Sequence, residues 1–178
     1  MQVKTSNKLD GVLFIEPALH RDSRGYFVET YKTSTFEKHL PVTFAQDNLS
    51  QSAKGVIRGM HFQVAPMAQG KLVQCLTGSI FDVVLDLRKN SKTYGKWEGI
   101  RLTSESHQMI YVPEGFAHGF QALEEGTKVL YKCTKLYSKE YERGIRFDDP
   151  DLAISWPYPP SLISPKDFEL PYLKDLKL

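Results

Sequence analysis

The sequence lacks several features that would mark a specialised class of protein. It has only two cysteines, Cys75 and Cys133, among 178 residues, and each lies inside an apolar run. We expect two buried free thiols, with a single disulfide as the alternative. No stretch approaches the length of a membrane span, and the first residues, MQVKTSNKLDGVLF, lack the apolar core of a signal peptide. The expectation is therefore a soluble, cytoplasmic protein.

Neither sign of charge dominates. There are 23 basic and 21 acidic residues, spread without long runs, for a net charge of +2. This balance gives no electrostatic case for binding nucleic acid or a membrane surface, although it does not exclude a local basic pocket for a phosphorylated small molecule. The 41% hydrophobic and 25% charged content is typical of a globular protein. We expect one domain over residues 1–178, with residues 157–178 as a C-terminal extension that wraps its surface.

Short apolar and β-branched segments recur along the chain at intervals of about ten residues, separated by Gly, Pro, Asn and Ser. That spacing predicts an all-β sandwich or barrel and not alternating βαβ units. The expected strands lie within residues 11–16, 25–31, 42–48, 56–62, 71–76, 79–87, 108–112, 118–123 and 128–134.

Two short helices are predicted from capping signals. Ser34 and Glu37 form a capping-box pattern that would open a helix before Pro41. Ser164 is followed by Pro165, which is the pattern of a cap residue and a proline at the first helical position.

Alternation of side chains along the strands points three titratable groups inward. Lys71, Tyr131 and His118 each share a strand face with the apolar residues two positions away. A buried ionisable group is costly unless it is paired, so convergence of the three would indicate a site. The alternative is that each is a snorkelling or interfacial side chain.

A segment from Gln46 to Leu72 is unusually rich in polar side chains for a strand pair. Strict alternation would place Arg58 and His61 on opposite faces, and a bulge at Gly59 would turn one of them. The polar residues of this segment are Gln46, Asn48, Arg58, His61, Gln63, Gln69 and Lys71.

A second motif, VPEGFAHG from Val112 to Gly119, is similar to the second half of the cupin signature. A metal cupin would carry His-x-His in its first half, whereas this chain has His61-Phe62-Gln63. Glutamine is a poor ligand for transition metals. We therefore expect no metal and no cofactor, and keep a metal-dependent cupin oxygenase or isomerase as a remote alternative.

Long motifs are spread over nearly the whole chain. They are DSRGYFVE (22–29), QDNLSQSAKGVIRGMHFQ (46–63), residues 69–97, VPEGFAHGF (112–120), residues 131–157 and SPKD (164–167). Together they resemble the dTDP-4-dehydrorhamnose 3,5-epimerase family. The resemblance implies a metal-free cupin jelly roll of antiparallel strands (a double-stranded β-helix) that works as a homodimer.

The resemblance also implies a reaction, the epimerisation of dTDP-4-dehydro-6-deoxy-D-glucose at C3 and C5. In such enzymes a base removes a proton beside the C4 ketone and an acid returns one on the opposite face. By resemblance His61 is the base with Asp167 as its partner, Lys71 stabilises the enolate oxygen, and Tyr131 is the acid. A cation near Tyr131 would be expected to lower the pKa of its phenol. A C3-only or C5-only epimerase and a non-enzymatic sugar-binding cupin are the alternatives.

Binding residues are implied in the same way. Arg58 is similar to a residue that contacts the diphosphate, and His118 and Tyr137 to residues beside the sugar, with Asp82 as a partner of His118. Some nucleotide contacts come from the partner subunit in this family. For Arg24 and Glu29 a surface ion pair is the alternative. The positions implied around the nucleotide are Arg24, Phe27, Glu29, Gln46 and Asn48.

Overall fold

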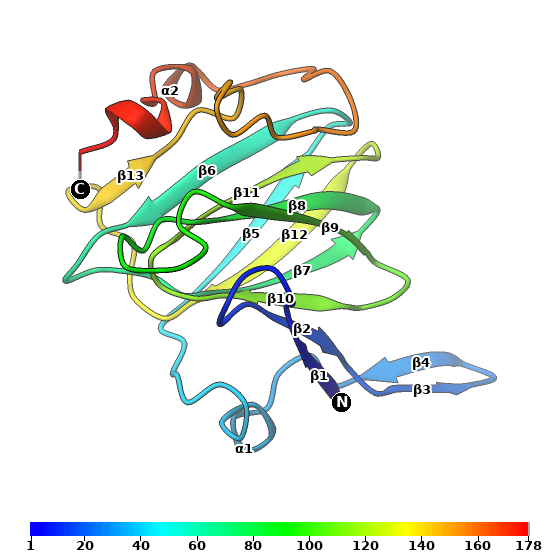
Figure 1. The fold of residues 1–178 in the computed structure, drawn as a ribbon. Helices are drawn as coiled ribbons and strands as arrows, with labels where there is room; N and C mark the ends of the chain where they lie inside the picture. The colour runs from blue at the N-terminus through cyan, green and yellow to red at the C-terminus, as the bar shows by residue number, and fades with distance from the viewer. Residues whose placement is uncertain (178) are drawn as a thin grey trace.

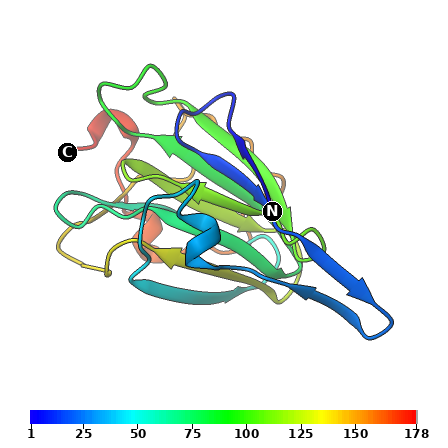
Figure 2. The same ribbon diagram turned by 90° about the horizontal axis from the view of Figure 1, so that it is seen from below.

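A computed structural model describes residues 1–177, which fold into two antiparallel sheets packed face to face and a separate hairpin (Figure 1). The six-stranded sheet has the order β1 (Gln2–Thr5), β2 (Leu13–Glu16), β10 (Met109–Val112), β7 (Lys71–Thr77), β12 (Thr127–Cys133) and β5 (Gln46–Ser52). The five-stranded sheet has the order β13 (Glu142–Gly144), β6 (Ile57–Gln63), β11 (Phe116–Ala122), β8 (Ser79–Asp86) and β9 (Trp97–Thr103). The hairpin pairs β3 (Leu19–Asp22) with β4 (Gly25–Val28) and projects from the sheets in both views (Figure 1 and Figure 2).

The main core lies between the two sheets. Val73 and Val129 come from the six-stranded sheet, and Val84, Phe116 and Phe120 from the five-stranded one, all in one buried cluster. Full burial of such a side chain contributes roughly 1.5–3 kcal/mol. This architecture confirms the predicted all-β fold of jelly-roll type.

Both sheets are also covered on parts of their outer faces. Phe36 and Leu40, from α1 (Thr33–Phe36) and the residues after it, pack on Leu72 and Met109 of the six-stranded sheet. On the five-stranded sheet, segments after β13 cover a second apolar face made by residues such as Leu85. Because that sheet is covered on both faces, the residues of β8 and β11 are buried almost without alternation.

Each predicted strand segment overlaps a strand, but two differ clearly in extent: β4 ends at Val28, before the predicted residue 31, and β5 begins only at Gln46. Residues 42–45 precede β5 as irregular chain, because Val42 and Phe44 pack on the α1 cluster and do not join the sheet. Four strands were not predicted: β1, β3, β9 and β13. They are short or interrupted by glycine and charge, so their apolar pattern is weak.

The two predicted helices have different outcomes. The short helix before Pro41 is confirmed as α1, but the capping box at Ser34 is wrong, because the helix already begins at Thr33 with Lys32 as its cap residue and without a side-chain capping bond. Burial of Phe36 fixes this helix in place of a cap. The second prediction is confirmed: α2 (Pro165–Phe168) begins after Ser164, whose Oγ accepts a hydrogen bond from the Asp167 N–H at 3.1 Å.

The chain after Trp156 is hydrogen-bonded along the five-stranded sheet and ends in a 3₁₀ turn, η1 (Leu173–Asp175). The Ile57 N–H donates to the Leu162 carbonyl at 3.4 Å, and the Arg146 N–H donates to the Pro171 carbonyl at 3.0 Å. These contacts place α2 beside β6 (Figure 1). Residue 178 of the predicted extension lies outside the described residues.

The two cysteines, Cys75 and Cys133, are both free and buried, as expected. Burial raises the pKa of the Cys75 thiol to about 11. Over residues 1–177, no helix has the length and apolar character that crossing a membrane requires.

Candidate active site

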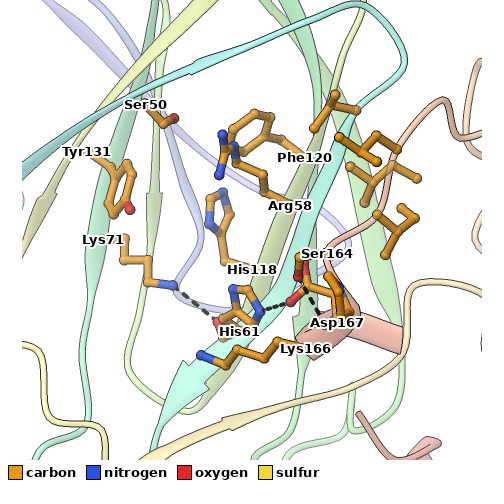
Figure 3. A pocket seen from close by; sticks show the side chains of 15 residues that line it. Ser50, Arg58, His61, Lys71, His118, Phe120, Tyr131, Ser164, Lys166 and Asp167 are labelled. Atoms are coloured by element: carbon orange, nitrogen blue, oxygen red, sulfur yellow. Dashed lines mark hydrogen bonds and ion pairs between the residues drawn. The ribbon is translucent and has the colours of Figure 1, made fainter. Parts of the chain in front are cut away.

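A cavity of about 430 Å³ opens between the two sheets at one end of the sandwich (Figure 3). A second cavity of about 270 Å³ adjoins it, and His61, Lys71 and Tyr131 line both. Most of the predicted site residues therefore surround one continuous space.

Strand alternation places Lys71 and Tyr131 in this space, as predicted. Tyr131 lies opposite Val73 in the pairing of β12 with β7, so it sits one strand away from Lys71 on the inner face. The Lys71 ammonium donates a hydrogen bond to the His61 carbonyl at 3.1 Å. Burial lowers the pKa of Lys71. A lysine held in this way is a preorganised cation that water does not screen.

A β-bulge brings Arg58 and His61 to the same cavity. His61 pairs with His118 and Arg58 pairs with Phe120, so two residues of β6 lie opposite one residue of β11. Gly59 in the bulge has a φ of +130°, and a Cβ there would lie 2.5 Å from the Gly119 Cα. The predicted bulge is confirmed, and only glycine fits the close approach of the two strands.

His61 is paired with a buried carboxylate. Its Nε2 lies 2.7 Å from Asp167 Oδ1, and the Asp167 side chain is 6% exposed. Burial alone would raise the pKa of Asp167, but the hydrogen bond and attraction of His61, with the Gly59 and Ser164 contacts, outweigh it and lower this pKa. An ionised carboxylate accepts only, so it fixes the tautomer with the proton on Nε2.

A second histidine–carboxylate pair lies deeper. His118 Nε2 is 2.8 Å from Asp82 Oδ2, and both side chains are buried. The predicted pairing of Asp82 with His118 is confirmed. His118 lines the larger cavity (Figure 3), whereas Asp82, on the neighbouring strand β8, does not line it.

Arg58 reaches the larger cavity while its guanidinium is anchored to β5. Its Nε donates to Ser52 Oγ at 2.9 Å and its Nη2 to the Gln51 carbonyl at 3.1 Å. The expectation that a cation lowers the pKa of Tyr131 is not met. Burial raises the pKa of this phenol, and the attraction of Arg58 offsets only part of that effect. Tyr131 is therefore protonated at neutral pH.

The predicted nucleotide residues divide into two groups. Gln46 and Asn48 line the smaller cavity with Tyr137, and Gln46 Nε2 donates to Asn48 Oδ1 at 2.9 Å. Arg24 and Phe27 lie apart, at a hollow on the projecting hairpin. Within this chain Arg24 forms a surface ion pair with Asp22, and Glu29 lies 3.9 Å from Lys32.

Two residues that the sequence did not single out also line the cavities: Glu142 lines the smaller one and Lys166 the larger one. Tyr137 Oη donates to Glu142 Oε2 at 2.7 Å, and Lys166 Nζ donates to the same oxygen at 2.6 Å. Burial would raise the pKa of Glu142, but these two hydrogen bonds outweigh it and lower this pKa. The sequence could have pointed to Lys166, because this residue stands inside the SPKD motif beside Asp167. It contained no comparable signal for Glu142, which belongs to the three-residue strand β13.

Over residues 1–177, no three His, Cys, Asp or Glu side chains gather as metal ligands would. The titratable groups are arranged for proton transfer instead. A histidine paired with a carboxylate stands on the five-stranded sheet and a protonated phenol on the six-stranded sheet, with a buried lysine beside them. A base and an acid on facing walls of one cavity define an acid–base isomerase of jelly-roll fold.

Known proteins agree with this class. A family model described as dTDP-4-dehydrorhamnose 3,5-epimerase matches residues 6–175. The enzyme of that name from Methanothermobacter thermautotrophicus is 54% identical over 156 residues, which are 87% of this chain and 83% of that protein. The chain belongs to the dTDP-4-dehydrorhamnose 3,5-epimerase family and is an isomerase.

Two further relatives bear on the reaction. The crystal structure of the Legionella pneumophila 3,5-epimerase in complex with dTDP-4-keto-L-rhamnose superposes with a TM-score of 0.94 at 40% identity, covering 99% of this chain and 94% of that one. A dTDP-4-dehydrorhamnose 3-epimerase from Streptomyces niveus is 42% identical over 161 residues, which are 89% of this chain and 78% of that protein. The relatives of this chain thus include enzymes named as 3,5-epimerases and an enzyme named as a 3-epimerase.

Proposed function

We propose that this enzyme inverts both C3 and C5 of dTDP-4-dehydro-6-deoxy-D-glucose and so produces dTDP-4-dehydro-L-rhamnose. The observation that carries the proposal is the placement of His61 and Tyr131 on facing sheets, with Lys71 on β7, the strand next to that of Tyr131. Inversion of a carbon requires a proton to leave one face and return to the other, and this geometry supplies a group for each face.

His61 is the base in this mechanism. With Nε2–H donated to the Asp167 carboxylate, Nδ1 has a free lone pair that can remove the proton beside the C4 ketone. The carboxylate then stabilises the imidazolium that forms, as the aspartate does in a catalytic triad.

Lys71 stabilises the enolate. Removal of a proton beside the ketone moves negative charge onto the C4 oxygen, and a buried ammonium that is already oriented needs little reorganisation to meet it. A single preorganised donor of this kind contributes roughly 3–4 kcal/mol to the transition state.

Tyr131 is the acid on the opposite face. Because burial raises the pKa of the phenol, the side chain carries its proton before the reaction starts. The enolate carbon takes that proton and the inverted sugar results. Before the next inversion the tyrosinate recovers a proton and the His61 imidazolium releases the one that it took, and the attraction of Arg58 stabilises the tyrosinate meanwhile.

The binding residues extend the proposal to the whole nucleotide sugar. Arg58 and Lys166 line the larger cavity and suit the diphosphate, while Gln46, Asn48 and Tyr137 line the smaller one. We further propose a homodimer in which the hairpin residues Arg24, Phe27 and Glu29 complete the site of the partner subunit. The 67% exposure of the Phe27 side chain on a projecting hairpin supports this assignment. Two free thiols fit a cytoplasmic location.

Inversion of a single carbon is the alternative, because the acid, the base and the lysine serve either outcome. Incubation of the 4-keto sugar nucleotide with the enzyme in D₂O distinguishes the two. We expect deuterium at both C3 and C5, detected by NMR of the product. Label at one carbon would establish a single-carbon epimerase, and absence of label at both would refute the proposed chemistry.

A further inference from the structure

Gln63 occupies the position where a metal cupin would carry its second histidine, and its carboxamide is fully engaged by backbone groups. Its Nε2 donates to the Met67 carbonyl at 2.6 Å and to the Leu136 carbonyl at 3.2 Å. Its Oε1 accepts from the Ser138 N–H at 2.6 Å. The side chain is buried. It therefore joins two loops that would otherwise have unpaired polar groups.

Two other glutamines hold the same loop, residues 135–138. Gln69 Nε2 donates to the Lys135 carbonyl at 2.7 Å, and Gln46 Oε1 accepts from the Tyr137 N–H at 2.8 Å. Side-chain carboxamides from three different segments thus bind four consecutive residues of the loop that follows β12.

The loop is held through its backbone and not through apolar packing. Leu136 is 58% exposed and Tyr137 is 52% exposed. Tyr137 nevertheless has a defined position, because its Oη donates to Glu142, which also accepts from Lys166. The carboxamide bonds beneath the loop therefore set the wall of the smaller cavity.

The groups that move protons do not depend on this loop. Lys71, His61 and Tyr131 stand on β7, β6 and β12, and each of them is paired with a residue of a neighbouring strand. We infer that Gln63 is a positioning residue for substrate binding, which acts by fixing Tyr137 through the loop and leaves the proton-transfer step unchanged. This inference rests on the proposed function, in which Tyr137 contacts the nucleotide sugar.

The test substitutes Gln63→Glu, which keeps the shape but gives a carboxylate that cannot donate to two carbonyls. Gln121→Glu is the matched control. Gln121 is equally buried, and its Nε2 donates to the Gly55 and Tyr158 carbonyls while its Oε1 accepts from the Tyr158 N–H. Both variants lose the same kind of bonds, but only one of them touches the loop at residues 135–138.

Steady-state kinetics on the 4-keto sugar nucleotide and calorimetric binding of dTDP-glucose, which carries the sugar but has no C4 ketone, are measured for both variants, with thermal unfolding in parallel. For Gln63→Glu we expect KM and the Kd of dTDP-glucose to rise about tenfold, which corresponds to the loss of roughly one hydrogen bond, with kcat held within about threefold. For Gln121→Glu we expect a similar fall in Tm with KM and Kd unchanged. Equal changes in KM for the two variants, or a fall in kcat alone, would overturn the inference.

Two further variants keep the test decisive if Gln63→Glu does not fold. Gln69→Leu removes one loop bond and should raise KM and Kd in the same direction but less. Gln69→Leu in the Tyr137→Ala background should add little to Kd if the glutamines act through Tyr137, whereas additive effects would contradict this. Because calorimetry with dTDP-glucose needs no turnover, it tests positioning even if the enzyme inverts neither carbon.

Discussion

Substitution of Gly59 by alanine tests whether the bulge in β6 aligns the site. A Cβ at Gly59 would lie 2.5 Å from the Gly119 Cα and 2.9 Å from the His118 carbonyl oxygen. These are backbone atoms of the neighbouring strand, so they cannot move aside as the end of a flexible side chain can. The two strands must separate where His61 pairs with His118.

Two contributions set the expected loss of unfolding free energy in Gly59→Ala. The positive φ of +130° at Gly59 costs a non-glycine residue about 1–3 kcal/mol. Overpacking against fixed backbone adds about 1–3 kcal/mol. Gly126 is the control, because it has a φ of +67° and a methyl group added at its Cα would meet nothing within 4 Å. We therefore expect Gly126→Ala to lose about 1–3 kcal/mol and Gly59→Ala about 2–6 kcal/mol of unfolding free energy.

Urea unfolding followed by tryptophan fluorescence measures both losses, and the kinetics of epimerisation measure the alignment. A displacement of His61 by about 1 Å should lower kcat/KM roughly 10²-fold in Gly59→Ala, whereas Gly126→Ala should retain its activity. If Gly59→Ala is no less stable than Gly126→Ala and equally active, the close contact of β6 with β11 does not hold the base in place.

Three further substitutions address individual groups of the site. Lys71→Met should abolish turnover yet raise the unfolding free energy at pH 7 by about 1–2 kcal/mol, because it removes a buried charge. This gain in stability should shrink as pH rises through the lowered pKa of Lys71, because above that pKa the wild-type lysine is neutral as well. Tyr131→Phe should still exchange the substrate proton with D₂O but form little inverted product by NMR. Asp167→Asn should lower kcat/KM about 10²–10⁴-fold. The stability of this variant should also respond less to acid. In the wild type the lowered pKa of Asp167 contributes stability at pH values above the pKa of this residue in the unfolded chain, and that contribution is lost as pH falls through its pKa in the folded protein.

Each of these expectations has a contrary outcome. A Lys71→Met protein less stable than the wild type would mean that the ammonium is well compensated by its single carbonyl contact. Equal loss of exchange and inversion in Tyr131→Phe would assign the tyrosine to binding. Unchanged kinetics in Asp167→Asn would remove the carboxylate from the mechanism, and an unchanged slope of stability against pH would contradict its lowered pKa.

The inward direction of Lys71 and Tyr131 could be predicted because β7 and β12 are regular over both residues. In a regular strand, alternation fixes which face a side chain takes, and apolar neighbours identify the inner face. His118 followed the same rule on β11. Their roles in the reaction came from the family resemblance, since direction alone does not distinguish a catalytic lysine from a structural one.

His61 and Glu142 show where local pattern is insufficient. The position of His61 depends on a bulge whose size is set by Gly119 on the neighbouring strand, so Gly59 could suggest the bulge but not establish it. Glu142 belongs to a three-residue strand and resembles a surface charge in the sequence. The loop at residues 135–138 has no periodicity, because its order comes from glutamines far away in the chain.

The pair of His61 and Asp167 joins residues 106 positions apart, and this separation has a consequence for the protein during its synthesis. Translation proceeds from the N-terminus, so the strands that carry His61, Lys71 and Tyr131 leave the ribosome before α2 does. A nascent chain can thus carry His61, Lys71 and Tyr131 before it has the carboxylate, and before it has the part of the cavity wall that residues 162–167 form. Under the proposed mechanism, competence for the reaction is acquired only when residues 164–167 dock on β6, so a chain stalled before that point would lack both the carboxylate and part of the cavity.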